Sequence, residues 1–204
     1  MTSTPLIGVL AIQGDVREHV TALEESGART VRVRTTSDLE GLHGLVLPGG
    51  ESTTMSKLAL ADGLMGPLRQ ARAAGLPMYG SCAGMIMLAD TITDARPDQE
   101  TVGGLAVTVR RNGYGRQVDS FEADLDIPAI GDQPMRAVFI RAPYVEAVGP
   151  GVEVLARVDR PDGSTIVGVR EGRLMATSFH PELTGDHRIH RLFLEIVQDA
   201  RGMS

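Results

Sequence analysis

Met78-Tyr79-Gly80-Ser81-Cys82-Ala83-Gly84 reads as the end of a strand, a sharp turn and the beginning of a helix. The cysteine stands in a Gly-x-Cys-x-Gly frame, which is the nucleophile-elbow motif with cysteine in the serine position. Its glycines let two backbone segments approach closely, and the turn holds the central residue in strained dihedral angles. The stretch therefore predicts an α/β protein in which Cys82 stands directly after a strand.

Strand-like runs alternate with helical patterns through the first half of the chain. Gly27 is placed to end the first helix. A βαβα order is typical of a parallel sheet with helices on both faces. The strands are predicted at 6–12, 30–34, 45–47 and 78–80, and the helices at 16–26, 53–74 and 83–90.

The second half changes to short strand-like runs separated by turn signals such as Pro161-Asp162-Gly163, a pattern typical of hairpins. A helix returns at 186–200, where apolar residues form one stripe. We therefore expect a single domain over residues 1–204, with a central, mostly parallel mixed sheet flanked by helices and extra β-hairpins in the second half. The polar segment 93–101 is predicted to be an exposed loop that tolerates change. The later strands are predicted at 105–109, 138–140, 152–158, 165–169 and 174–179.

Composition limits the classes of function. Lys and Arg number 20 against 26 Asp and Glu, a net charge of −6, and no basic cluster stands out, so we expect no nucleic-acid partner. No apolar run approaches the roughly 18 residues that span a bilayer, and the run 6–12 has no basic residue before it, unlike a signal peptide. We therefore predict a cytoplasmic protein without membrane attachment. A single cysteine excludes an intramolecular disulfide and a cysteine-rich zinc site.

The chemistry is predicted to depend on Cys82. A lone cysteine is most often a small buried apolar residue, and that is the alternative interpretation. Here, however, a helix N-terminus beneath the sulfur favours the thiolate, which is the nucleophilic form. The elbow position therefore predicts that Cys82 is a nucleophile.

Leu47-Pro48-Gly49-Gly50-Glu51-Ser52 also follows directly after a predicted strand. Adjacent glycines let main-chain N–H groups face a ligand, as an oxyanion hole requires. The alternative is a plain turn in which Ser52 caps the next helix. In either case the segment lies at the carboxyl edge of the sheet, where ligands bind in open α/β folds.

Ser178-Phe179-His180-Pro181-Glu182 ends the last predicted strand. Residues two apart in an extended chain point to the same side, so His180 and Glu182 can face one site. A nucleophile, a base and a carboxylate that orients the base are the parts of a catalytic triad. No suitably spaced cysteine or carboxylate accompanies the other histidines, so no metal is predicted. We interpret those histidines as solvated or packing residues: His19, His43, His187 and His190.

These three segments, in this order, resemble the class I (triad) glutamine amidotransferases, which have a flavodoxin-like α/β fold. More narrowly, nearly the whole chain is similar to the glutaminase subunits of pyridoxal 5'-phosphate synthases, the enzymes of vitamin B6 biosynthesis. The narrower markers are IGVLAIQG (7–14) with REH (17–19), PGGESTT (48–54), RNGYGRQVDSF (111–121), FIRAP (139–143) and SFHPELT (178–184).

The resemblance implies roles for individual residues. Cys82 attacks the side-chain amide of glutamine, His180 moves the protons, and Glu182 holds the imidazole in register. The oxyanion hole lies at the main-chain N–H groups of Gly50 and Ala83, and no cofactor is needed. The resemblance assigns glutamine binding to Gly50, Glu51, Ser52, Arg111, Ile140 and Arg141.

The same resemblance implies a partner, a synthase subunit with a TIM-barrel fold that receives the ammonia in a hetero-oligomeric complex. Such glutaminases are typically idle until the partner docks, so the segment around Gly49 and Gly50 is expected to be misset in the free protein. For Arg111 and Arg141, a guanidinium fork suits the α-carboxylate of glutamine, and the alternative is a surface ion pair.

Two other functions stay open. The first keeps the triad but serves another synthase, or hydrolyses γ-glutamyl peptides. The second is a non-catalytic subunit that only binds and regulates a partner. The presence of Cys82, His180 and Glu182 speaks against the second, because a purely structural role needs none of them.

Overall fold

Five parallel strands form the first half of a ten-stranded sheet in the described part of the chain, which comprises residues 4–111, 120–160 and 163–202 of a computed structural model. Strands buried on both faces read as continuous apolar runs rather than as alternating ones, which explains the apolar segments in the sequence. In spatial order they are β2 (Arg29–Val33), β1 (Leu6–Leu10), β3 (Gly44–Leu47), β4 (Met78–Ser81) and β12 (Leu174–Thr177).

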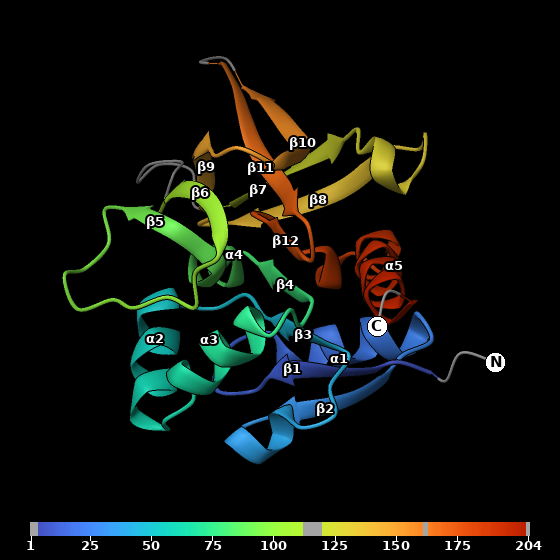
Figure 1. Cartoon of the computed structure of the whole chain (residues 1–204). Helices are drawn as coiled ribbons and strands as arrows, with labels where there is room; N and C mark the ends of the chain where they lie inside the picture. The colour runs from blue at the N-terminus through green and yellow to red at the C-terminus, as the bar shows by residue number, and fades with distance from the viewer. Residues whose placement is uncertain (1–3, 112–119, 161–162, 203–204) are drawn as a thin grey trace.

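Beyond these strands the sheet becomes mostly antiparallel, as Figure 1 shows in its upper half. A separate antiparallel pair packs beside it. The predicted mixed sheet with hairpins in the second half is therefore confirmed. The sheet continues with β11 (Gly163–Glu171), β9 (Tyr144–Val148), β6 (Leu105–Arg110) and β5 (Ala89–Thr93), with β10 (Glu153–Arg160) paired to β11, and the separate pair is β7 (Ser120–Leu125) with β8 (Met135–Ile140).

Helices cover both faces of the parallel half. One layer contains α1 (Val16–Glu25), α5 (Arg188–Gly202) and the β7–β8 pair, and the other contains α2 (Ser52–Ala61), α3 (Met65–Ala73) and α4 (Ala83–Leu88). No helix in the described ranges has both the length and the apolar character needed to cross a membrane. Short 3-10 turns occur at Thr36–Leu39, Pro128–Ile130 and Pro181–Leu183.

Successive strand residues divide the core into two layers. Val46 packs with the α1 and α5 layer, whereas Leu45 and Leu47 pack with α2, α3 and α4. On β4, Tyr79 packs with the α1 and α5 layer, and Met78 packs with α2, α3 and α4. Because side chains alternate across a strand, the two apolar clusters fix the sheet between the helix layers and leave the ends of the strands for the site.

Several predicted boundaries are wrong for local reasons. The helix predicted at 53–74 is two helices, because Gly63 (φ +68°) ends α2 before α3 begins. The helix predicted at 83–90 stops at Leu88 and runs directly into β5, which the apolar pattern did not reveal. Gly27 (φ +93°) ends α1 as predicted. Part of the hairpin signal, 161–162, and part of the marker block, 112–119, lie outside the described residues.

The turn from β4 into α4 brings two backbones into contact through its glycines. A Cβ at Gly84 would overlap the carbonyl oxygen of Leu47, and a Cβ at Gly80 would overlap the carbonyl oxygen of Gly84. Backbone atoms cannot move aside as a flexible side chain can. The Gly-x-Cys-x-Gly frame is therefore a steric requirement of the fold.

Gly84→Ala is expected to lower the free energy of unfolding by about 1–3 kcal/mol or more, because overpacking against a fixed backbone forces the strand and helix apart. Urea unfolding of the purified variant measures this. Gly202→Ala is the matched control, since its Cβ would meet nothing within 4 Å among the residues that the structure describes, and it should change stability by less than about 0.5 kcal/mol. Equal stability of the two variants would contradict the steric account.

Candidate active site

Loops that follow β1, β3, β4 and β12 meet at the carboxyl edge of the parallel strands, where ligands bind in open α/β sheets. With the end of β8 they surround a cavity of about 310 Å³. Every predicted site residue lines this cavity except Glu182, which lies behind His180. The lining residues are Gln13, Asp15, Gly50, Glu51, Ser52, Cys82, Ala83, Ile86, Arg111, Ile140, Arg141, Pro143 and His180.

Cys82 caps the N-terminus of α4 in a strained backbone conformation, with φ +48° and ψ −103°. Its main-chain N–H donates to the Thr177 carbonyl oxygen at 2.8 Å, which anchors the turn to β12. The sulfur lies 3.9 Å from the carbonyl oxygen of Ile140. Cys82 is only 6% exposed, yet it lines the cavity. This placement is that of a nucleophile elbow rather than of a core residue.

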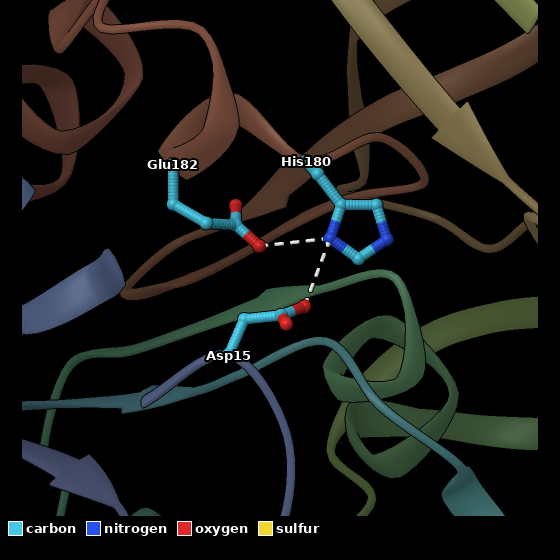
Figure 2. Close-up of side chains that lie close together, drawn as sticks. All are labelled: Asp15, His180 and Glu182. Atoms are coloured by element: carbon cyan, nitrogen blue, oxygen red, sulfur yellow. Dashed lines mark hydrogen bonds and ion pairs between the residues drawn. The ribbon is translucent and has the colours of Figure 1, made fainter. Parts of the chain in front are cut away.

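Nδ1 of His180 faces two carboxylates, which Figure 2 shows together. Its N–H donates to Glu182 Oε1 at 2.8 Å and lies 3.3 Å from Asp15 Oδ2. The Glu182 side chain is fully buried, whereas that of Asp15 is 38% exposed. The main-chain N–H of His180 donates to Val138 on β8 at 2.9 Å. His180 is therefore held by its backbone N–H and by Nδ1 of its ring. Its Nε2 atom points away from the carboxylates.

Burial and charge act in opposite directions on this pair. Burial alone would lower the pKa of His180, but its contacts with Asp15, Cys82 and Glu182 raise that pKa to about 12. Burial alone would raise the pKa of Glu182, but His19 and His180 hold that pKa well below its ordinary range. Opposite charges and hydrogen bonds to the charged form favour ionisation. The pair is therefore an imidazolium beside a carboxylate.

Asp15, His180 and Glu182 also bring three possible metal-ligand atoms within 4.8 Å of one another. The imidazole atom that faces both carboxylates is Nδ1, and its proton is already directed at Glu182. A metal ligand must be deprotonated, so binding would remove this hydrogen bond. We interpret the cluster as a hydrogen-bonded set.

Gly49 and Gly50 pack between His180 and the residues that follow β1. The Asp15 N–H donates to the Gly49 carbonyl oxygen at 3.1 Å, and a Cβ at Gly49 would lie 2.9 Å from His180 Nδ1. A Cβ at Gly50 (φ +155°) would overlap the side chain of Gln13. Both glycines are thus needed for this segment to reach the cavity.

Glu51, and not Ser52, is the N-cap of α2, so the alternative in which Ser52 caps the helix is wrong. The Glu51 carboxylate accepts from the N–H groups of Thr53 and Thr54 at 3.0 and 2.8 Å. Burial would raise the pKa of Glu51, but these hydrogen bonds hold it below its ordinary value. The Glu51 N–H donates to Gln13 Oε1 at 2.9 Å. Glu51 therefore shapes the loop through both its side chain and its backbone.

Arg111 joins this loop to the segment 93–101. Nη2 pairs with Glu51 Oε1 at 3.2 Å, and Nη1 donates to Gln99 Oε1 at 2.6 Å. Nε2 of Gln99 in turn donates to Ser52 Oγ at 3.1 Å. The segment 93–101 is exposed at 94–98 as predicted, but Gln99 is partly buried against the site. Gln99 therefore links this exposed segment to the site residues Arg111 and Ser52.

Ile140 and Arg141 enter the cavity from the end of β8. Ile140 is 38% exposed, and Arg141 has a positive φ of +43°, which turns the chain at this point. Ala83 follows Cys82 as the first residue of α4. All three predicted residues line the same cavity as the sulfur.

The sequence interpretation missed Gln13, Asp15 and His19. The first two follow β1, and a position after a parallel strand was the available signal. His19 is fully buried, and its Nε2 lies 3.4 Å from Glu182 Oε1. His190 is fully buried as well, so of the two predicted alternatives, solvated or packing, the packing one holds for both histidines.

Comparison with known proteins agrees with this geometry. The model of the SNO glutamine amidotransferase family matches residues 9–199. The chain is 61% identical over 196 residues to "Pyridoxal 5'-phosphate synthase subunit PdxT" of Clavibacter michiganensis subsp. michiganensis, covering 96% of this chain and 92% of that one. The protein of the same name from Kineococcus radiotolerans is 59% identical, with 98% of each chain covered.

Solved structures agree as well. One described as a glutamine amidotransferase superposes with a TM-score of 0.86 at 48% identity, covering 94% of this chain and 98% of that one. A putative GMP synthase subunit from Thermoplasma acidophilum shares the fold, with a TM-score of 0.67 at 19% identity and coverage of 100% and 98%. The resemblance predicted from the sequence motifs is confirmed. The chain belongs to the SNO glutamine amidotransferase family.

Proposed function

We propose that this chain is the glutaminase subunit of a pyridoxal 5'-phosphate synthase, hydrolysing L-glutamine to L-glutamate and ammonia. The observation that carries the proposal is a strained Cys82 in a cavity with His180, whose Nδ1 is hydrogen-bonded to the buried Glu182. A nucleophile, a base and an orienting carboxylate in that sequence suit acyl transfer from an amide. The relatives that bear this subunit name support the choice of substrate.

The first half of the reaction forms a thioester. The thiolate of Cys82 attacks the side-chain amide carbon of glutamine, and the main-chain N–H groups of Gly50 and Ala83 stabilise the resulting oxyanion. The raised pKa of His180 keeps its imidazole protonated at neutral pH. That imidazolium gives its Nε2 proton to the departing ammonia as the carbon–nitrogen bond breaks, leaving a glutamyl thioester on Cys82.

The second half releases glutamate. His180, now neutral, takes a proton from a water molecule as the water attacks the thioester carbonyl. The tetrahedral intermediate collapses, the carbon–sulfur bond breaks, and the thiolate of Cys82 is restored beside the imidazolium. Throughout, the hydrogen bond from Nδ1 to Glu182 keeps the Nε2 atom directed at the reacting groups.

Substrate binding is proposed for the residues that line the rest of the cavity. Arg111 and Arg141 supply guanidinium groups suited to the α-carboxylate of glutamine. Gln99 supports Arg111 and Ser52 from behind. The proposed binding set is Gly50, Glu51, Ser52, Arg111, Ile140 and Arg141.

The ammonia is proposed to pass to a synthase subunit with a TIM-barrel fold in a hetero-oligomeric lyase complex in the cytoplasm. The partner is also proposed to switch the glutaminase on. The segment at Gly49 and Gly50 supports this, because its position depends on loop contacts with Gln13 and Asp15 at the cavity edge. A docked partner could reset such contacts without moving Cys82.

Glutamate production from glutamine is expected only when the synthase subunit is added, and Cys82→Ala should abolish it under every condition. A coupled glutamate assay of wild type and variant, with and without the partner, measures this. Partner-independent turnover would indicate a free glutaminase, and turnover of γ-glutamyl peptides would indicate a hydrolase. Activity retained by Cys82→Ala would overturn the proposed nucleophile.

Glu182→Gln is expected to destabilise the protein most at neutral pH. The folded pKa of Glu182 lies below its ordinary value of 4.5, so its ionised form contributes stability above that value, and the contribution is lost as the pH falls. The difference in unfolding free energy between wild type and variant should therefore shrink below about pH 4.5. Urea unfolding across a pH series tests this, with the exposed Glu153→Gln as control. If the difference in unfolding free energy between wild type and variant grew as the pH fell, the predicted direction of the pH dependence would be wrong.

Gln99→Leu is expected to raise the KM for glutamine about 3-fold to 10-fold, because Arg111 and Ser52 lose the amide that links them, and a lost hydrogen bond costs about 1 kcal/mol. The kcat should change less, since Gln99 lies away from Cys82. Steady-state kinetics with the partner present measure both constants. The neighbouring Asp98→Asn removes exposed ion pairs with Lys57 and Arg96 and should leave KM unchanged. An unchanged KM in Gln99→Leu would show that this loop does not support the site.

A further inference from the structure

His19, on α1, lies behind the buried carboxylate and touches two other elements as well. Its Nε2 is 2.8 Å from Ser81 Oγ and 3.4 Å from Glu182 Oε1. Its Nδ1 is 3.0 Å from His190 Nε2 on α5. Ser81 directly precedes Cys82. The imidazole of His19 therefore links the strand that presents the sulfur to the carboxylate that orients the base.

The neighbours of His19 determine where its proton lies. Glu182 is held ionised, so its Oε1 can only accept. Burial and the nearby His19 lower the pKa of His190 to about 3, so His190 is neutral. A proton on His190 Nε2 donates to His19 Nδ1 and leaves the His19 proton on Nε2, facing the carboxylate. The reverse arrangement would place the lone pair of Nε2 against Oε1 and is disfavoured.

The carboxylate of Glu182 has few donors. Oε1 faces both N–H groups, from His180 at 2.8 Å and from His19 at 3.4 Å. Oε2 has no hydrogen-bond partner among the described residues. An ionised buried carboxylate that loses one of two donors is costly to keep in place. It can then turn away or take up a proton, and either change weakens its hold on His180.

We propose that His19 is a positioning residue for the glutaminase reaction, which holds Glu182 ionised and oriented toward His180 and ties it to the strand that carries Cys82. His19 lines no part of the cavity, so it acts through Glu182 and Ser81 and not on the substrate. The kinetic part of this inference rests on the proposed function. The effect of His19 on the reactivity of the Cys82 thiol does not rest on the proposed function.

The ionisable groups around this cluster come from each element packed against it. A change at His19 alters the hydrogen bonds at the centre of the set, so the pH dependence of Cys82 alkylation reports on it. The groups are Asp15 after β1, Tyr79 on β4, Cys82 before α4, His180 and Glu182 after β12, His187 before α5 and His190 on α5.

Three substitutions of His19 distinguish the role of its N–H donor from the role of its size. His19→Gln keeps an N–H donor near the place of Nε2, His19→Met removes the donor at similar length, and His19→Asn places its amide near Nδ1, out of reach of Glu182. His43→Gln, in a histidine whose ring bonds to the Leu6 N–H away from the site, is the matched control. Two readouts are used: alkylation of the single cysteine by iodoacetamide across pH, and kcat and KM with the synthase subunit. Urea unfolding identifies the variants that fold.

His19→Met is expected to lower kcat about 10-fold to 100-fold with little change in KM, as losses of supporting hydrogen bonds do. The pH midpoint of alkylation should rise by about 0.5 unit or more, because a weaker imidazolium favours the thiolate less. His19→Gln should recover most of both, and His43→Gln should match wild type. If His19→Met does not fold, His19→Asn takes its place.

The inference would be overturned if the alkylation profile of His19→Met superposed on that of wild type or had a lower pH midpoint. It would also be overturned if His19→Gln were as impaired as His19→Met. Wild type without glutaminase activity in the presence of partner would instead overturn the proposed function. The alkylation profiles would then still decide whether His19 supports the Cys82–His180 pair.

Discussion

The close approach of Gly84 to the carbonyl oxygen of Leu47 is the constraint on which the site depends. It allows α4 to begin directly after β4, and it forces Cys82 between them into a backbone conformation with φ +48°. Because backbone packing fixes the turn, the position of the sulfur does not rely on a flexible side chain. The neighbouring strands β1, β3 and β12 end at the same edge, so the loops that follow them reach the sulfur with few residues of chain.

Buried charge is the second organising element. The carboxylate of Glu182 would be unstable alone in the core, and its histidine partners keep it ionised. Asp15, the Cys82 sulfur and Glu182 together keep His180 protonated. His19 on α1, Glu182 and His180 after β12, and Cys82 before α4 are therefore neighbours in series, and each stabilises the charge of the next. Such an arrangement suits a proposed reaction in which one proton moves between the base and the leaving group.

Much of this site could be predicted from the sequence, because glycine frames and residues two apart in a strand are local features. A local pattern of about seven residues or fewer was enough to predict Cys82, the Gly49–Gly50 segment, and His180 with Glu182. The partners of these residues could not be predicted in the same way. His19 and Gln99 come to the site through long-range packing, and no local pattern distinguishes them from ordinary polar residues. Gln13 and Asp15 carry only the weak signal that they follow a parallel strand. The same limit explains the three strands that were not predicted, β5, β7 and β9, because each is held by pairing with another strand and not by an apolar run of its own.

A covalent intermediate on the sulfur tests the central claim most directly. The chain contains one cysteine, so acid-quenched mixtures of the protein, its synthase partner and glutamine can be digested and the Cys82 peptide weighed by mass spectrometry. The account predicts a fraction of that peptide carrying one glutamyl group, absent in Cys82→Ala and lost on treatment with hydroxylamine, which cleaves thioesters. Glutamate formed at the normal rate with the Cys82 peptide unmodified at every quench time, or a glutamyl group found on another residue, would contradict it.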